Sequence, residues 1–435
     1  MIANLNKYVL IVAGILGNVF AQDLLTVEDA IKTGLEKNYS VLIVKNIQEI
    51  AKAQNNLGNA GMSPTVSLNG GLNASSLNSH QEFNTGAIQD RTGARANNLS
   101  ASLNANWTVF DGLRMFAIKK RLGLNEELSA IQLKQQMENT VYNIILSYYN
   151  VIRINELIKA AKQNLSIYAE RKKIAQLKLE IGSDSRVDFL LTQSDENKAK
   201  SDIVKLEIEL LNAKANLNSL LARPIDTDFM TADTIVVNYN PGIDELKKTA
   251  PSANTSLLIA KQNELIFAQS VKEAQAGSLP FVQLLGAYNF TRNQSQAGIV
   301  FLNRQTGFTG GITASWLLFN GGRNNRLVKE RNILALNQKY LTAQTQLQVD
   351  AIVYTNYKSF VMNKTVVDLE LQNLGDSREV QTVSLERYKI GKSTLLETIE
   401  TQRNLEEAQV RYINAIYSMK VAEAELLRAN GSLVK

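Results

Sequence analysis

The hydrophobic positions change their spacing several times along the chain, and each spacing predicts a different element. Residues 24–60 and 243–277 have helical spacing and few helix breakers. Each of these segments is followed by two stretches in which apolar and polar residues alternate, which predicts β-strands. A long helical stretch then runs from about residue 111 to 222, and a second one from about 320 to 430. This order predicts a mainly α chain that carries four strands.

The same order of elements occurs twice, which indicates a tandem duplication. The offset between the two tryptophans, 316 − 107 = 209, is also the offset between Gly182 and Gly391. These glycines interrupt the long helical stretches, so we expect hairpin tips where the chain turns back. The motif that ends the second strand of each copy consists of Trp107, Phe110, Asp111 and Gly112 in the first copy and Trp316, Phe319, Asn320 and Gly321 in the second.

The duplication divides the chain into segments. We expect a first structural repeat at residues 22–223, a linker at 224–242 and a second repeat at 243–435. Within the linker, residues 234–237 have the composition of a short strand.

The returning helical arms carry a seam of apolar residues spaced alternately by three and four positions. An ordinary helical bundle gives such spacing too, but in helices this long the pattern favours a coiled coil. In the second copy the seam consists of Leu405, Ala408, Tyr412, Ala415, Met419, Ala422 and Leu426, and in the first copy of Ala199, Ile203, Leu206, Leu210, Ala213 and Leu217.

The four alternating segments contain no acidic or basic residue. The nearby charges Glu82, Asp90, Arg91 and Arg95 fall in residues 77–96, which we interpret as a connecting loop. A half-buried sheet of a soluble protein shows the same alternation, but it usually carries charge on its wet face. Strands of about ten residues, apolar on one face and small and polar on the other, are typical of membrane β-barrels. The expected strands are residues 65–76, 97–109, 281–291 and 306–318.

A sheet in a membrane cannot leave an edge open, and closed single-chain barrels need about eight strands. Four strands are too few, so several chains must combine them: two chains give eight strands and three give twelve. Trp107 and Trp316 suit an aromatic girdle at the membrane surface, or else fill a core between sheet and helices. Asp111 and Asn320 fit as N-caps of the long helices.

The N-terminus and the composition narrow the possible functions. Residues 1–21 have a basic start, a short apolar run and small residues before Gln22, which predicts a secretory signal peptide; a buried N-terminal helix is the alternative. The chain has no cysteine and one histidine, His80, which lies in a polar stretch that predicts a loop tip. These counts exclude disulfides, cysteine nucleophiles and multi-histidine metal clusters. We expect no enzymatic activity, no cofactor and no metal.

Net charge does not favour nucleic acid as a partner. The chain carries a charge of +6, but its 47 basic and 41 acidic residues are interleaved without a basic block.

Together, the duplication, the Trp-x-x-Phe-Asp/Asn-Gly junctions, the paired Pro-x-Val strand starts and the glycine-centred tips resemble the TolC-like outer membrane factors. The resemblance covers the whole mature chain. It implies a homotrimer with a 12-stranded β-barrel in the outer membrane of a Gram-negative cell and an α-helical barrel in the periplasm. Such channels are passive exit ducts for tripartite efflux or type I secretion systems. They receive substrates from an inner-membrane transporter through a periplasmic adaptor protein.

The resemblance also implies a gate at the periplasmic end. By motif, Glu397 and Glu400 match acidic residues that form rings there, and Tyr388 matches a tyrosine whose acidic partner matches Asp188. An arginine of the best-known gate is replaced by Ser393, so at least one closing ion pair should be absent. From the residues alone, Glu397 and Glu400 share one helix face, and a solvated pair explains them equally well.

Two other classes of protein share some of these features. A soluble periplasmic coiled-coil adaptor or structural protein would have the long helices, but not two equivalent halves or four uncharged strands. A carboxylate-based hydrolase would need a paired acidic site in a recognisable pocket, and the sequence offers none.

Overall fold

The computed structural model describes residues 24–237, 239, 241–297 and 299–434. The expected signal peptide, residues 1–21, lies outside the described residues.

The described chain is mostly helical and carries one sheet of four strands, which confirms the predicted fold class. The chain divides into two compact units that we describe separately. The sheet unit comprises residues 44–133 and 255–347, and the helical unit comprises residues 24–43, 134–254 and 348–434. In chain order the elements are α1 (Val27–Lys37), α2 (Tyr39–Gln54), β1 (Thr65–Glu82), β2 (Ile88–Phe110), α3 (Arg114–Glu180), α4 (Arg186–Leu220), α5 (Ile243–Ala253), α6 (Thr255–Gln275), η1 (Ala276–Ser278), β3 (Phe281–Ser295), β4 (Leu302–Ser315), α7 (Arg323–Lys389) and α8 (Leu395–Ala429).

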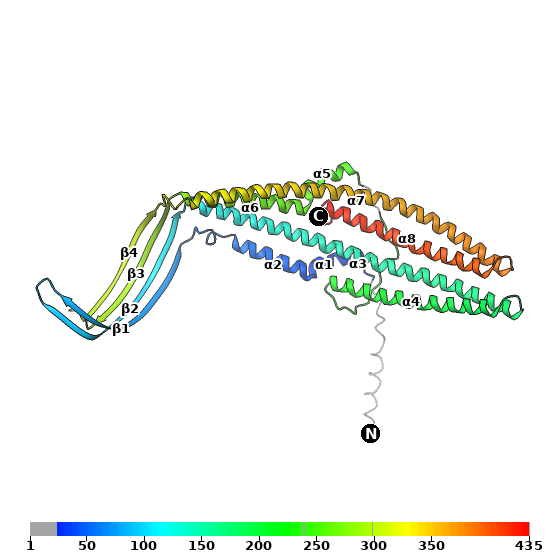
Figure 1. The fold of residues 1–435 in the computed structure, drawn as a ribbon, viewed down its shortest axis with the longest axis horizontal. Coiled ribbons are helices and arrows are strands. Elements are labelled where there is room, and N and C mark those ends of the chain that lie inside the picture. The colour runs from blue at the N-terminus through cyan, green and yellow to red at the C-terminus, as the bar shows by residue number, and fades with distance from the viewer. Residues whose placement is uncertain (1–23, 238, 240, 298, 435) are drawn as a thin grey trace, which may run out of the picture. The chain divides into compact units, whose positions relative to one another are not determined.

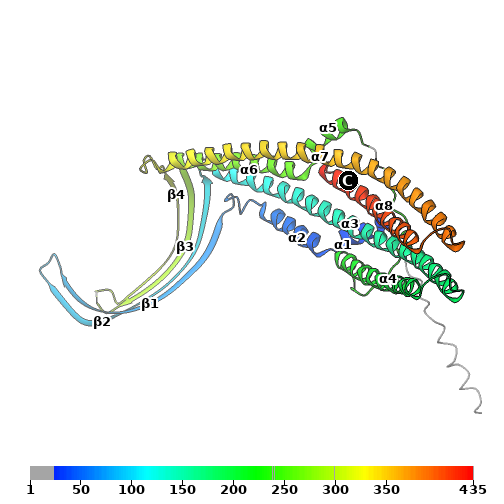
Figure 2. The ribbon, with the colours of Figure 1, turned by 45° about the vertical axis from the view of Figure 1, so that its right-hand side comes forward.

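In the sheet unit the four strands are antiparallel and lie in the order β1-β2-β3-β4 (Figure 1). Figure 2 shows that the strands are curved. Within the described residues, one edge of β1 and one edge of β4 have no neighbouring strand.

The expected loop at residues 77–96 is wrong, because most of it belongs to β1 and β2. These strands continue to a turn at residues 83–87, beyond the last pairing of β2 with β3 at Ala96 and Ser295. His80 therefore lies in a strand, directly opposite Asp90 and in contact with it, rather than in a loop tip. Since this hairpin extends beyond the rows that all four strands share, it can carry charged side chains without placing them in those rows.

Cross-strand pairing fixes which residues share a face of the sheet. Leu68 pairs with Leu103, Leu103 with Tyr288, and Tyr288 with Phe308, so these four side chains form one row of an apolar face. All four are exposed. The sheet thus presents a wide apolar surface.

The opposite face is mostly polar, and it is uncharged in the rows that all four strands share. Asn73 pairs with Asn98, Asn98 with Asn293, and Asn293 with Asn303, which places four asparagines in one row across the sheet. In the rows that all four strands share, the described residues of this face include no Asp, Glu, Lys or Arg. The alternation seen in the sequence therefore separates an apolar face from an uncharged hydrogen-bonding face.

In the helical unit, α4 lies alongside α3 and α8 alongside α7 (Figures 1 and 2). The helices α3 and α7 are both 67 residues long, and α4 and α8 are both 35 residues long, so the two hairpins match residue for residue. Both expected seams face inward. The buried seam residues are Ile203, Ala213 and Leu217 in α4 and Leu405, Ala408, Ala415, Ala422 and Leu426 in α8.

The core of the helical unit lies where α1 packs against α3 and α4. A side chain on Gly34 of α1 would collide with Ile144 of α3, so glycine allows this close approach. Tyr148 is buried, and its hydroxyl donates to the carbonyl oxygen of Leu25 at 2.9 Å. This core holds together residues from both ends of the first repeat.

The strand expected at residues 234–237 is not formed. None of the described strands includes this segment or pairs with it, and Ile235 instead packs against the core near α1. The nearest pairing is an isolated parallel bridge between Leu24 and Met230. Among the described helices, none is both long enough and apolar enough to cross a membrane.

Candidate functional site

The two hairpin tips have the same backbone because a glycine ends each long helix. Gly182 has φ +75° and Gly391 has φ +71°, a left-handed conformation that glycine adopts without strain. Beyond each glycine the chain bonds back onto the helix: Ser183 N donates to Lys178 O at 2.9 Å, and Lys392 N to Arg387 O at 2.8 Å. This pattern is the Schellman motif, which satisfies the last carbonyls of a helix.

The returning helices begin differently at the two tips. At the first tip, Ser185 and Asp188 form a capping box: the Ser185 hydroxyl accepts from Asp188 N, and Asp188 Oδ2 accepts from Ser185 N, both at 3.2 Å. At the second tip, Thr394 accepts from Glu397 N at 3.2 Å. The Glu397 carboxylate instead contacts Arg387 of α7, with Nη1 and Oε1 3.4 Å apart.

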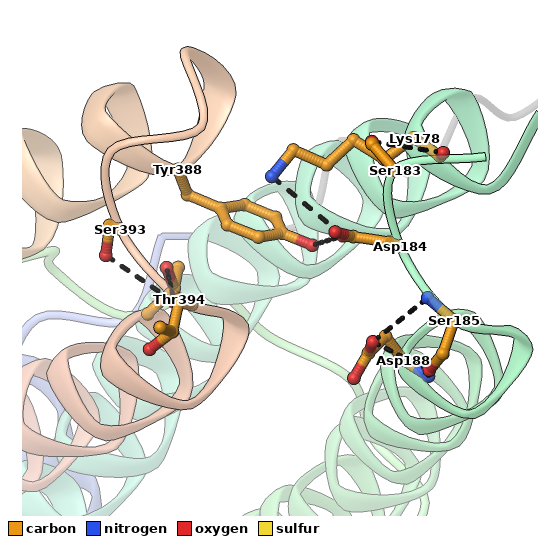
Figure 3. Close-up of polar contacts among 9 residues, drawn as sticks. Lys178, Ser183, Asp184, Ser185, Asp188, Tyr388, Ser393 and Thr394 are labelled. Carbon is orange, nitrogen blue, oxygen red and sulfur yellow. Dashed lines mark hydrogen bonds and ion pairs between the residues drawn. The ribbon is translucent and has the colours of Figure 1, made fainter. Parts of the chain in front are cut away.

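Tyr388 joins the two tips through Asp184, and not through Asp188 as expected. Its hydroxyl donates to Asp184 Oδ2 at 2.9 Å, across from α7 to the α3–α4 loop (Figure 3). The Asp188 carboxylate instead caps the start of α4, because it accepts hydrogen bonds from the backbone N–H and the hydroxyl of Ser185. The family resemblance implied Asp188 as the partner, whereas the tyrosine hydroxyl bonds to Asp184.

The surroundings of Tyr388 keep its hydroxyl a donor. The side chain is buried and packs against Ile174, Leu385 and Leu395. Burial raises the pKa of Tyr388, and the hydrogen bond to Asp184 raises it further. The phenol therefore stays protonated throughout the neutral range.

Lys178 completes this contact. Its Nζ lies 3.8 Å from the centre of the Tyr388 ring and 3.9 Å from Asp184 Oδ2. One cation thus contacts both members of the pair that joins the tips.

The two glutamates expected to form acidic rings are exposed, and each has a basic partner in its own chain. Glu400 accepts from Arg403 Nη2 at 2.6 Å, while Glu397 pairs with Arg387 as described above. Ser393 makes one weak contact, 3.5 Å from the carbonyl oxygen of Thr394. At the second tip the arginine therefore comes from α7, six residues before Ser393.

A buried charge that no sequence pattern indicates lies behind the first tip. Arg171 of α3 is 1% exposed, and its Nη2 donates to Asp195 Oδ2 of α4 at 2.5 Å. The guanidinium also lies 4.8 Å from the centre of the Tyr168 ring. Burial lowers the pKa of Arg171, and Asp195 opposes that effect. An arginine among many on a charged helix gives no signal of its burial in the sequence.

The junctions between strands and helices belong to the sheet unit. Trp107 Nε1 donates to Met62 O at 2.8 Å, and Trp316 Nε1 donates to Ser278 O at 3.0 Å. Trp316 follows the end of β4 at Ser315, so the strand expected to reach residue 318 is shorter than predicted. The two indole side chains are 43% and 60% exposed, which excludes a core-filling role within the described chain.

Asp111 and Asn320 cap the long helices from further back than expected. Because α3 begins at Arg114, Asp111 is not the N-cap residue, yet its Oδ1 accepts from Met115 N at 3.0 Å. Gly112, with φ +74°, turns the chain so that this contact forms. Asn320 Oδ1 accepts from Asn324 N at 3.4 Å in the same way.

The remaining junction residues differ between the copies. Phe110 ends β2 and is partly buried, whereas Phe319 is 83% exposed. Gly321 has φ +68° and lies in open space. A side chain on Gly112, in contrast, would collide with the carbonyl of Ala276, so the first junction is packed more closely than the second.

The described residues offer little for metal or cofactor chemistry. No group of three or more His, Asp or Glu side chains among them is placed to hold a metal ion. The tips can instead make or break a small set of hydrogen bonds and ion pairs between two hairpins.

Comparison with known proteins finds relatives along most of the chain. The family model described as "Outer membrane efflux protein" matches residues 32–223 and 248–432, one segment in each copy. The chain is 21% identical over 358 residues to the outer membrane protein TolC of Escherichia coli (strain K12), covering 79% of this chain and 72% of TolC. It is 18% identical over 344 residues to the outer membrane efflux protein BepC of Brucella suis biovar 1, covering 77% and 72%.

A solved structure has the same fold. The outer membrane protein VceC of Vibrio cholerae superposes with a TM-score of 0.78 at 13% identity, covering 93% of this chain and 96% of VceC.

Proposed function

Because the chain belongs to the outer membrane efflux protein family, we propose that it is a passive exit channel for substrates delivered by an inner-membrane pump. The protein is located in the outer membrane of a Gram-negative cell and extends into the periplasm. The observation that carries the proposal is the sheet, whose exposed apolar face opposes an uncharged polar face. Such a sheet suits lipid on one side and a water-filled passage on the other.

We further propose that the functional channel is a homotrimer. A sheet with free edges at β1 and β4 leaves backbone N–H and C=O groups unpaired, which is costly in lipid. If β1 of one chain pairs with β4 of the next, three chains close a barrel of 12 strands. Two chains would give eight strands, a barrel whose interior is filled by side chains and leaves no passage.

The hairpin tips are proposed as the periplasmic gate. Tyr388, Asp184 and Lys178 would hold the two hairpins of one chain together, and Asp188 would support them by fixing the start of α4. Glu397 and Glu400 would form rings in the trimer, each weakened by an arginine of its own chain. The gate would therefore be less negative than the count of glutamates suggests.

The proposed partners are a periplasmic adaptor and an inner-membrane transporter, forming a tripartite efflux or type I secretion system. The absence of cysteine allows a direct test, since a single cysteine introduced at Ile181 or Ile390, both exposed at the tips, has no competing thiol. In cells that express the cognate adaptor, either tip cysteine should form a cross-link to the adaptor. An equivalent cysteine at the exposed Leu347 should not capture it.

Fractionation of the cell envelope tests the channel itself. We expect the protein in the outer membrane fraction, a trimer after extraction in detergent, and discrete pores in a planar lipid bilayer. A soluble periplasmic monomer would contradict the proposal and favour an adaptor or structural protein.

The gate requires its own test. The double variant Glu397→Ala/Glu400→Ala should change the bilayer conductance, ion selectivity and block by divalent cations. Unchanged values for all three would mean that these glutamates do not line the gate.

A further inference from the structure

Two arginines stand out on the apolar face of the sheet. Arg292 of β3 and Arg304 of β4 are directly paired across the strands, and both are exposed. In the same row, Arg292 pairs with Leu99, which pairs with Leu72. The arginines therefore share the face of the leucines and aromatic residues, not the polar face.

Neither guanidinium forms an ion pair with any residue that the structure describes. The sequences of β3 and β4 contain no acidic residue, and the acidic residues of β1 and β2, Glu82 and Asp90, lie beyond the rows that all four strands share. Like charges directly opposite each other destabilise a sheet. An anion from outside the chain would remove this repulsion.

The arginines lie at one boundary of the apolar face. Leu284 pairs with Trp107 near the end of the sheet where the helices attach, and Arg292 is eight residues further along β3. At about 3.3 Å per residue and a tilt of about 40°, these rows are about 20 Å apart across a membrane. The apolar band of outer membrane barrels is about 25 Å tall. The tryptophan row and the arginine row would thus mark its two borders.

An aromatic ring orients one of the two guanidinium groups and leaves its hydrogen-bond donors unused. The Arg304 guanidinium lies 5.5 Å from the centre of the Phe290 ring, one row closer to the middle of the face. Stacking on an aromatic ring orients the planar fork and leaves its N–H donors free at the edges.

From this geometry we infer that Arg292 and Arg304 bind the phosphate group of a lipid headgroup in the outer leaflet. Paired guanidinium groups match the oxygens of a phosphate through charge-assisted hydrogen bonds. Leu99, in the same row, and Phe290, one row closer to the middle of the face, would contact the acyl chains of the same lipid. A free phosphate ion has no part that uses this apolar surface. The inference rests on the proposed function, because it requires that the apolar face meets lipid.

Lipid binding to the detergent-extracted full-length protein tests the inference. Native mass spectrometry would compare lipid A, its dephosphorylated form and inorganic phosphate on the wild type and on Arg292→Gln/Arg304→Gln. We expect the wild type to bind lipid A about tenfold more tightly than the dephosphorylated form, and the variant to lose this preference. Arg91→Gln, in the hairpin beyond the shared rows, is the matched control and should behave like the wild type.

Three outcomes would overturn the inference. They are equal binding of both lipids by the wild type, an undiminished preference in the double variant, and full displacement of lipid A by millimolar inorganic phosphate. Pore formation by the same preparations separates this result from the proposed function. If the wild type forms trimeric pores but shows no phosphate preference, only the lipid site is wrong; if it forms neither trimers nor pores, the channel proposal itself fails.

Discussion

At the scale of single residues, the contacts at the tips depend on which carboxylates already accept hydrogen bonds from their own helix start. Asp184 and Asp188 are four residues apart and chemically identical, yet only Asp184 is free to accept from Tyr388. The difference comes from Ser185, which recruits Asp188 into a capping box. At the second tip Glu397 holds the matching helical position, but it contacts Arg387 instead of completing such a box. The two helix starts thus place carboxylates at matching positions in different contacts.

Removing the hydroxyl of Tyr388 should loosen the contact between the tips. Tyr388→Phe keeps the buried ring and its contact with Lys178 but loses the hydrogen bond to Asp184. A hydrogen bond to a charged group contributes about 1.5 kcal/mol, so we expect an open probability about tenfold higher in single-channel recordings. Tyr340→Phe, at an exposed position of α7, is the control and should leave gating unchanged. Equal open probabilities for both variants would exclude Tyr388 from the closing contacts.

The ion pair between buried Arg171 and partly exposed Asp195 should show strong coupling. Asp195→Leu leaves a buried cation without its acceptor, which we expect to cost about 3 kcal/mol of unfolding free energy. The double variant Arg171→Met/Asp195→Leu removes both charges, so most of that loss should be recovered. Urea unfolding followed by circular dichroism measures both values. If the double variant is as unstable as the single one, the pair is not what stabilises this region.

At the scale of elements, the repeated hairpins were the most predictable part of the molecule. The seam spacing and the glycines located α3, α4, α7 and α8, because long helices follow local rules. The strands were less predictable. Charges in residues 77–96 were interpreted as a loop, although a hairpin beyond the shared rows can carry charge while remaining paired. Residues 234–237 have strand composition but no partner strand, and a strand requires one.

The left-handed turn at the second tip can be tested by alanine substitution, with a glycine inside α7 as the control. In Gly391→Ala the new methyl group has open space, but φ +71° is unfavourable for alanine, so we expect a loss of about 1 kcal/mol. Gly375 lies inside α7, also with open space around it, and there alanine should stabilise the helix by about 1 kcal/mol. The thermal midpoints of the two variants should shift in opposite directions. A rise in both would mean that the left-handed turn is not required at the tip.

At the scale of the whole molecule, the sequence predicted that several chains must combine, because four strands cannot close a barrel. It did not reveal how the faces are patterned across strands. The row of Asn73, Asn98, Asn293 and Asn303 depends on registers set by strand pairing, which no single segment encodes. The burial of Arg171 among helices from distant parts of the chain was hidden for the same reason.

The asparagine row predicts an uncharged, hydrogen-bonding belt around the passage of the proposed trimer. In Asn293→Asp, each chain adds one carboxylate to this face, and the three charges together should shift selectivity toward cations. The shift would be measured as the reversal potential across a planar bilayer with a KCl gradient. Asn97→Asp is the matched control, since Asn97 pairs with Gln294 on the opposite face of the same sheet and should leave the reversal potential unchanged. If the Asn97 variant shifts selectivity and the Asn293 variant does not, the apolar and polar faces have been assigned to the wrong sides of the barrel wall.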